Sequence, residues 1–146
     1  MLFRSVADMG ETMFAAPGVG LAANQIGLPV QIVVVDQSTK EKKDYLALIN
    51  PVLSGGQGTV ADDEGCLSVR EYHASVRRFY RIHVQALDVA GQPLNFDAED
   101  RFARIIQHEV DHLRGILFLD HLSGLKRALY KNKLKKILAR DGQEAA

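Results

Sequence analysis

The amino-acid sequence predicts an α+β fold, because segments with strand character cluster in the middle of the chain and segments with helical spacing lie at its ends. A chain of 146 residues is long enough for one domain with a hydrophobic core. No internal repeat, linker or low-complexity segment divides it. We therefore expect a single domain over residues 1–146.

The first half of the chain is predicted to begin with a helix and to continue with strands. Residues 1–16 can place their apolar side chains on one helix face, and Pro17-Gly18 should end that helix. Residues 31–36 contain a run of Ile and Val that predicts a buried strand. Residues 45–49 predict a second strand, which Asn50-Pro51 should end.

The second half is predicted to hold a loop, a strand and a helix. The sequence SGGQG at residues 54–58 predicts a flexible loop, and residues 76–88 predict a further strand that closes in a turn at residues 89–92. A helix should begin near Asp97, because aspartate is a good N-cap, and should end at about Leu113, just before a glycine.

Charge is unevenly distributed, although the formal net charge is zero. Residues 1–120 carry 11 Lys/Arg and 16 Asp/Glu, whereas residues 121–146 carry 7 Lys/Arg and 2 Asp/Glu. The basic tail coincides with a predicted amphipathic C-terminal helix over residues 122–139. Such a tail is typical of a solvated helix face, and it is also a candidate contact for ribosomal RNA.

The composition favours a cytoplasmic protein. No apolar run approaches the roughly 18–20 residues of a membrane span, and the start of the chain does not read as a secretory signal. Cys66 is the single cysteine, so an internal disulfide is excluded. We expect neither a membrane nor DNA as a partner.

The sequence HEVDH at residues 108–112 is the most informative motif. Side chains four residues apart on a helix lie on one face, about 5–6 Å apart at Cβ. His108 and His112 could therefore bind one divalent metal ion, with Glu109 placed to handle protons beside it. The motif also occurs by chance, and helix histidines are often ordinary core or boundary residues.

Glu109 falls inside an apolar stripe of the predicted helix, together with Phe102, Ile105 and Ile106. Burying an unpaired carboxylate costs several kcal/mol. Such a group needs a cation, a hydrogen-bond donor or a raised pKa, and each of these suits a proton-transfer group.

A third metal ligand could come from Cys66, which lies in the sequence EGCLS at residues 64–68. One cysteine with two histidines leaves the fourth tetrahedral position open, as in catalytic rather than structural sites. A lone cysteine is also a common small core residue.

The sequence GVGLAANQ at residues 18–25 could be a mere turn, but Gln25 supplies an amide donor that could face developing negative charge.

These segments, GVGLAANQ, EGCLS and QHEVDHL at residues 107–113, resemble the signature motifs of the peptide deformylases in order and spacing. The resemblance implies hydrolysis of the N-formyl group from the initiator formylmethionine of nascent polypeptides, with release of formate. It also implies antiparallel or mixed β-sheets packed around a central helix that carries both histidines.

The resemblance implies a role for each motif residue. Cys66, His108 and His112 would be the metal ligands, and Glu109 would be the general base and then the general acid. The Gln25 side chain and the Leu67 backbone N–H would stabilise the oxyanion. Family members commonly use Fe²⁺, and Ni²⁺, Co²⁺ or Zn²⁺ are further possibilities.

The same resemblance implies substrate contacts. The backbones around Val19, Gly20 and Gly65 would pair with an extended peptide as an added strand. The methionine side chain would lie against Val19, Ile105 and His108.

An ion pair between Glu64 and Arg78 is expected from similarly placed residues in relatives. The alternative is an ordinary surface ion pair of little consequence.

Other interpretations share some of these features. A zincin-type metallopeptidase would share the HEVDH motif, but it would use neither Cys66 nor the segment 18–25. A truncated, inactive fold that binds ribosomes through its basic tail is the non-enzyme alternative. The family usually has an N-terminal arm before the first helix, and residues 1–5 do not resemble it. We expect the arm to be missing here and the chain to be less stable for it.

Overall fold

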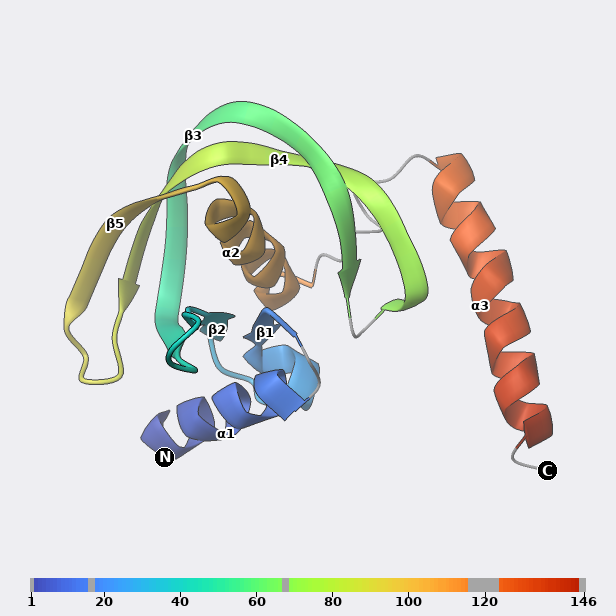
Figure 1. Ribbon diagram of the computed structural model, residues 1–146, viewed down its shortest axis with the longest axis horizontal. Helices are drawn as coiled ribbons and strands as arrows, with labels where there is room; N and C mark the ends of the chain where they lie inside the picture. The colour runs from blue at the N-terminus through green and yellow to red at the C-terminus, as the bar shows by residue number, and fades with distance from the viewer. Residues whose placement is uncertain (1, 16–17, 67–68, 116–123, 145–146) are drawn as a thin grey trace.

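The described strands form one antiparallel sheet that curves around a helix (Figure 1). The computed structural model describes residues 2–15, 18–66, 69–115 and 124–144. The sheet order is β1-β2-β3-β4-β5, so that neighbours in sequence are neighbours in space. The elements are α1 (Leu2–Ala15), β1 (Gly20–Ala22), the 3₁₀ helix η1 (Ala23–Ile26), β2 (Ile32–Asp36), β3 (Tyr45–Cys66), β4 (Val69–Leu87), β5 (Pro93–Glu99), α2 (Asp100–Leu113) and α3 (Gly124–Glu144).

The hydrophobic core of the described residues lies on both faces of the sheet. Val33 and Val35 of β2 face a cluster that includes Ile106 of α2. Ile32 and Val34 face a second cluster, on the side where α1 packs. Because β2 is buried on both faces, its run of Ile and Val is continuous rather than alternating. The sheet thus holds α2 on one side, inside the arch of β3 and β4 (Figure 1).

The predicted α+β class, central helix and C-terminal helix are confirmed. Helix α1 ends at Ala15, just before Pro17, and β2 covers the predicted strand. Helix α3 is described from Gly124 to Glu144, so it continues beyond the predicted end at Ala139. Its predicted start at Leu122 lies outside the described residues. None of the described helices is long and apolar enough to cross a membrane.

The predicted break in the second strand is wrong. Strand β3 continues through Asn50-Pro51 and through the predicted loop at residues 54–58. Its register against β4 shifts between Ile49 and Val52 and again between Ser54 and Gln57. Turn-forming residues therefore serve as β-bulges, which bend a long ribbon without ending it. The bend carries β3 and β4 over α2.

Two other predicted boundaries are also wrong. Strand β4 begins at Val69 rather than at Val76, because it pairs with the whole far part of β3. Helix α2 begins at Asp100 rather than at Asp97. Asp97 instead belongs to β5, where it lies opposite His83 of β4.

Candidate functional site

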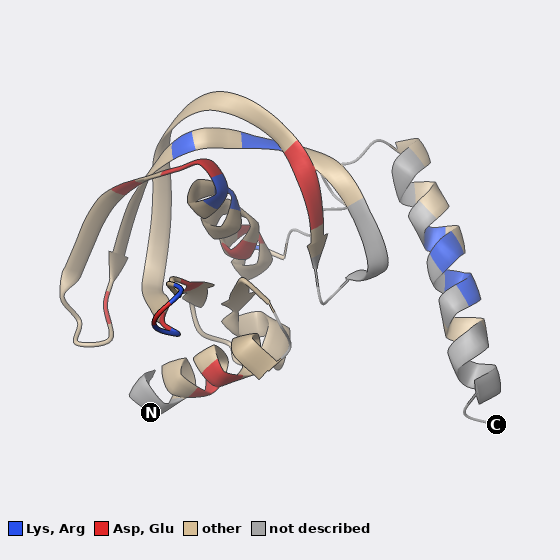
Figure 2. Ribbon diagram, in the orientation of Figure 1, with Lys and Arg blue, Asp and Glu red and all other residues tan. Residues whose placement is uncertain are grey.

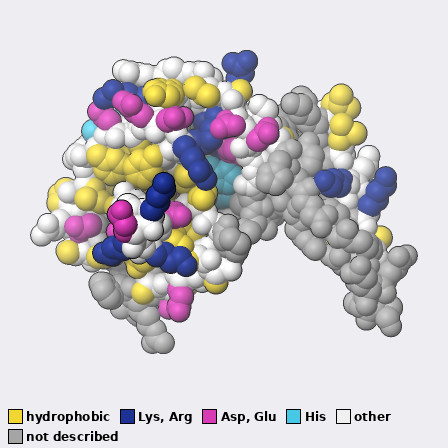
Figure 3. Space-filling model, in the orientation of Figure 1, with side chains coloured by type: hydrophobic (Ala, Val, Ile, Leu, Met, Phe, Trp, Pro, Cys, Tyr) yellow, Lys and Arg dark blue, Asp and Glu magenta, His cyan; other side chains and the backbone are white. Residues whose placement is uncertain are grey.

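The predicted catalytic helix presents its polar residues to the interior. His108, Glu109 and His112 of α2 are 8%, 5% and 3% exposed. Histidine accordingly contributes little to the surface in view in Figure 3. Each side chain lies between the helix and the sheet that encloses it, so their positions are fixed by packing on several sides.

The two histidines converge on one point. Their Nε2 atoms lie 3.1 Å apart, and the rings meet edge to face with centroids 4.8 Å apart. One ligand atom from each of His108, Glu109 and His112 falls within 4.8 Å of the others. Two converging imidazole nitrogens suit a transition-metal dication, and the carboxylate lies beside them. The residues present therefore fit the metal that the motif predicts.

A buried carboxylate orients the first histidine. Glu64 Oε1 lies 2.8 Å from His108 Nδ1, on the ring side away from His112. Burial raises the pKa of the Glu64 carboxyl, but hydrogen bonds from His108 and Arg78 outweigh that effect and lower it to about 2. An ionised carboxylate can only accept a hydrogen bond, so the His108 proton stays on Nδ1 and donates to Glu64. The free lone pair of the neutral ring is then on Nε2. That lone pair faces His112.

The expected ion pair between Glu64 and Arg78 is present, and it is buried rather than on the surface. Arg78 Nε donates to Glu64 Oε2 at 2.6 Å and Arg78 Nη2 donates to Glu64 Oε1 at 2.9 Å. The side chains are 4% and 6% exposed. A third nitrogen, Nη1, donates to Asp111 Oδ2 at 2.8 Å. The guanidinium thus joins β3, β4 and α2.

Arg104 is a member of this network that the sequence analysis missed. Its Nη1 donates to Glu64 Oε2 and, at 3.0 Å, to the carbonyl oxygen of Val76. Its Nη2 donates to the carbonyl oxygen of Val60. A sequence signal existed, because Arg104 precedes His108 by four residues and therefore lies on the same helix face.

Strand β1 and the 3₁₀ helix lie against the side of α2 that carries Glu109. A Cβ atom built on Gly20 would lie 2.8 Å from Cγ and 2.9 Å from Oε1 of Glu109, so glycine is required for this approach. Asn24 Nδ2 donates to the carbonyl oxygen of His112, near the end of the helix. The segment 18–25 is therefore a wall of the site and not an isolated turn.

The remaining predicted residues fall into three groups. Gln25 accepts a hydrogen bond from the Ala22 backbone N–H through Oε1 at 2.8 Å. Val19 is exposed, whereas Ile105 and Gly65 are half-buried. The backbone of Cys66 ends β3 opposite Val69, but the Cys66 side chain and the whole of Leu67 lie outside the described residues.

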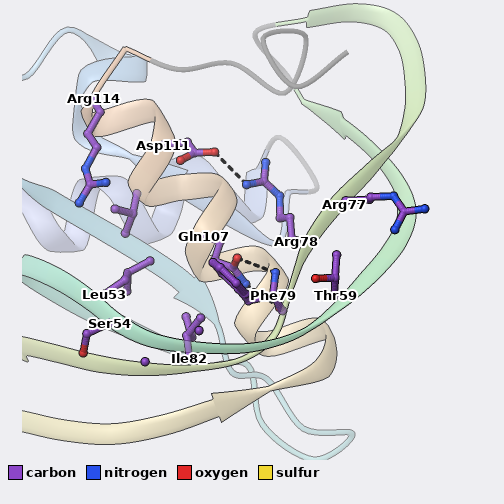
Figure 4. A pocket seen from close by; sticks show the side chains of 13 residues that line it. Leu53, Ser54, Thr59, Arg77, Arg78, Phe79, Ile82, Gln107, Asp111 and Arg114 are labelled. Atoms are coloured by element: carbon purple, nitrogen blue, oxygen red, sulfur yellow. Dashed lines mark hydrogen bonds and ion pairs between the residues drawn. The ribbon is translucent and has the colours of Figure 1, made fainter. Parts of the chain in front are cut away.

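A cavity of about 390 Å³ lies along α2, next to Arg78 and Asp111 of the buried network. Leu53 and Ile82 contribute apolar surface to it, and Arg114 and Asp111 contribute charge (Figure 4). Residues of α2 are among its described lining residues, but His108, Glu109 and His112 are not. The metal centre is therefore not in this cavity.

Gln107, next to His108, fastens α2 to the edge of β4. Its Oε1 accepts from the Phe79 backbone N–H at 3.0 Å and its Nε2 donates to the Phe79 carbonyl oxygen at 2.8 Å (Figure 4). Pairing of β4 with β5 ends at Arg81. The Gln107 amide thus takes the place of a neighbouring strand at Phe79, a role the sequence analysis did not anticipate.

Comparison with known proteins identifies this constellation. The chain matches the sequence profile of the family described as "Polypeptide deformylase" over residues 2–128. The chain belongs to the peptide deformylase family. It is 50% identical over 137 residues to the peptide deformylase of Desulfotalea psychrophila, a match that covers 92% of this chain and 81% of that protein.

Solved structures of the family have the same fold. A peptide deformylase from Legionella pneumophila superposes with a TM-score of 0.88 at 38% identity, covering 97% of this chain and 83% of that one. A peptide deformylase from Acinetobacter baumannii with Met-Ala-Ser bound superposes with a TM-score of 0.77 at 30% identity, covering 83% of this chain and 80% of that one.

Peptide deformylases are metalloenzymes that remove the formyl group from nascent peptides. Family membership therefore makes the chain a hydrolase, and His108, Glu109 and His112 form its possible metal-binding group.

Proposed function

We propose that this chain hydrolyses the N-formyl amide of N-terminal formylmethionine on nascent polypeptides and releases formate, with one divalent metal ion per chain. The convergence of His108 Nε2 and His112 Nε2, with Glu109 buried beside them, is the observation that carries the proposal. We propose Cys66 as the third ligand because it follows Glu64, which already contacts His108, by two residues.

We propose Fe²⁺ as the native ion, with Ni²⁺, Co²⁺ or Zn²⁺ able to replace it. One thiolate and two imidazoles are ligands that bind each of these dications. When bound, the ion supplies Lewis acidity and lowers the pKa of water at the open position. The residues around it must then position the substrate, move the proton and stabilise charge.

Glu109 moves the proton in this mechanism. It follows His108 in the helix, and its carboxylate lies within 4.8 Å of the ligand nitrogens of both histidines. It takes a proton from the attacking water and later delivers it to the departing amine nitrogen. Close packing against Gly20 restricts the carboxylate to this position. Restricted motion keeps the base aligned through both transfers.

Gln25 and Leu67 stabilise the oxyanion. The carbonyl end of the Gln25 amide accepts from Ala22, so the NH₂ end is the donor that can face the substrate. The backbone N–H of Leu67, which follows Cys66 directly, supplies the second donor. Preorganised donors of this kind are worth about 2.7–4 kcal/mol each in transition-state stabilisation.

The substrate peptide binds as an added strand. Among the described strands, β1 lies at the edge of the sheet and pairs only with β2. Its outer edge, at Gly20, can hydrogen-bond an extended peptide that passes Val19, and the Gly65 backbone can bind the opposite side. Val19, Ile105 and His108 line the methionine pocket. The tripeptide Met-Ala-Ser bound to the Acinetobacter relative has the sequence of a deformylated product.

Formate release tests the reaction. Anaerobically purified, Fe²⁺-loaded protein should release formate from formyl-Met-Ala-Ser and should not cleave unformylated Met-Ala-Ser. Glu109→Gln should keep the metal and lose about 10²–10⁴-fold in rate, the usual contribution of a general base. Glu99→Gln, an exposed change at the residue just before the same helix, is the control. Full turnover by Glu109→Gln would refute its role, and peptide-bond cleavage would favour a zincin-like activity.

The basic C-terminal helix supports a second proposal, that the enzyme works in the cytoplasm in contact with the ribosome. Lys131, Lys133, Lys135 and Lys136 of α3 are exposed. They form the basic stretch of α3 in Figure 2, where the helix stands apart from the body. Counterion release predicts that co-sedimentation with ribosomes weakens steeply as salt rises. Salt-independent binding, or none, would count against this contact.

A further inference from the structure

Arg104 connects α2 to the part of β3 and β4 that lies near Cys66, the third proposed ligand. Its guanidinium bonds Glu64, the Val60 carbonyl of β3 and the Val76 carbonyl of β4, and its side chain is 11% exposed. Beyond these carbonyls, β3 continues to Cys66. The histidines come from α2 and the cysteine from the end of β3. The distance between the histidines and the cysteine therefore depends on the contacts that hold α2 to the far part of β3.

Arg104 also completes the surroundings of the Glu64 carboxylate. Among the described residues, Oε1 receives Arg78 Nη2 and His108 Nδ1, and Oε2 receives Arg78 Nε and Arg104 Nη1. Each oxygen therefore accepts two hydrogen bonds. Without Arg104, Oε2 keeps one charged donor, and the carboxylate can tilt away from His108.

We propose that Arg104 is a positioning residue for the metal centre. It fixes the Glu64 carboxylate, and Glu64 in turn fixes the orientation of His108 and the nitrogen that carries its lone pair. This inference rests on the proposed function, because it concerns the geometry of that site. It adds a second arginine, contributed by the catalytic helix itself, to the expected pair of Glu64 and Arg78.

Metal affinity of the folded protein tests the role directly. Co²⁺ is titrated into metal-free protein and followed by its visible absorption, with Arg104→Met compared with Arg101→Met. Arg101 lies on the same helix but is exposed, so the two changes are chemically identical. Outer-shell partners are typically worth about 10–100-fold in metal affinity. Arg104→Met should weaken Co²⁺ binding by about that factor, and Arg101→Met should leave it unchanged.

A double-mutant cycle separates positioning from general stability. If Arg104 acts through Glu64, then Arg104→Met should weaken Co²⁺ binding far less in a Glu64→Gln background than in the wild type. A purely structural strut would give the same factor in both backgrounds, and that result would overturn the proposal. Equal Co²⁺ affinity for the wild type and Arg104→Met would also overturn it.

Arg104→Lys provides the second variant if the methionine variant does not fold. An ammonium group supplies charge to Glu64 but cannot keep the fork geometry that reaches two carbonyls as well. Its Co²⁺ affinity should therefore lie between those of the wild type and Arg104→Met, or at least several-fold below the wild type. Wild-type affinity in Arg104→Lys would overturn the proposal. Failure of the wild type to bind Co²⁺ would overturn the proposed metal centre as well, so the two failures are distinguishable.

Discussion

Strand β4 carries two arginines, three residues apart, that form similar ion-pair networks in opposite surroundings. Arg78 faces the interior and pairs with Glu64 and Asp111, next to His108. Arg81 faces outward and pairs with Asp97 and Glu99, next to His83. Each network thus contains two carboxylates, a histidine and an arginine of β4, and the inner network also includes Arg104 of α2.

The difference between the networks is solvent access. The side chains of Arg78 and Glu64 are 4% and 6% exposed, whereas those of Arg81 and Asp97 are 43% and 46% exposed. Water and salt can replace the partners of an exposed charge, but they cannot reach a buried one. The inner network can therefore hold His108 in one orientation. The outer network has similar groups, but solvent competes with its ion pairs.

The largest expected effect is on stability. Arg78→Met leaves the buried Glu64 and the half-buried Asp111 without their shared partner and should lower the free energy of unfolding by about 3–5 kcal/mol. Arg81→Met removes an equally paired but exposed arginine and should leave the urea midpoint nearly unchanged. Urea unfolding followed by circular dichroism measures both. Equal losses for the two variants would show that burial does not distinguish the networks.

Two glycines, Gly20 and Gly124, test the same contrast between a packed interior position and an exposed one. Gly20→Ala places a Cβ atom 2.8 Å from the Glu109 side chain and must displace it. A displacement of about 1 Å can cost 100-fold in rate, so deformylation should fall by about that factor. Gly124→Ala, where the added carbon meets nothing within 4 Å, is the control. Normal kcat/KM for Gly20→Ala would mean that the Glu109 position is not critical.

Two glutamines extend the contrast to neutral side chains. Gln107→Met leaves the Phe79 backbone N–H and carbonyl without the amide that pairs with them. An unsatisfied buried group costs about 1–3 kcal/mol, and because Phe79 is partly exposed a loss of about 1 kcal/mol is expected in urea unfolding. Gln85, exposed on the same strand β4, should tolerate the same substitution with little change. An unchanged urea midpoint for Gln107→Met would show that water replaces the two hydrogen bonds from the Gln107 amide.

The sequence predicted the elements that depend on their own pattern. The Ile and Val run of β2 and the helical spacing of α1 are local properties, and both elements formed where predicted. The sequence predicts a strand shorter than β3, because Asn50-Pro51 and the glycines of residues 54–58 usually end strands. Here the partner strand β4 spans the irregularities, and Asn50, Gly55 and Gly58 take positive φ at or beside the bulges. Partner strands are not visible in a local pattern.

The start of α2 illustrates the same limit. Asp97 is a good N-cap by residue type, but Arg81 and His83 bind its carboxylate on the neighbouring strand. Those distant partners hold residues 97–99 in β5, and the helix starts three residues later. Likewise, the motif predicted both histidines and Glu109, whereas Arg104 and Gln107 depend on backbone groups of β3 and β4. Such contacts require the folded ribbon.

The smallest expected effect is a shift in the titration of His83. Its hydrogen bonds to Asp97 and Asn95 raise the His83 pKa above its usual value of 6.5. A raised pKa means that the folded state favours protonated His83. The associated stability is therefore fully present below pH 6.5 and is lost as pH rises through the raised pKa.

Asp97→Asn should lower the His83 pKa toward 6.5. Adding 1 M NaCl should also lower the His83 pKa, since the pair is exposed. An NMR titration of the His83 ring proton measures both, and deformylation by Asp97→Asn should stay at the wild-type rate. A His83 that titrates alike in both proteins would show that solvent has already replaced the outer network.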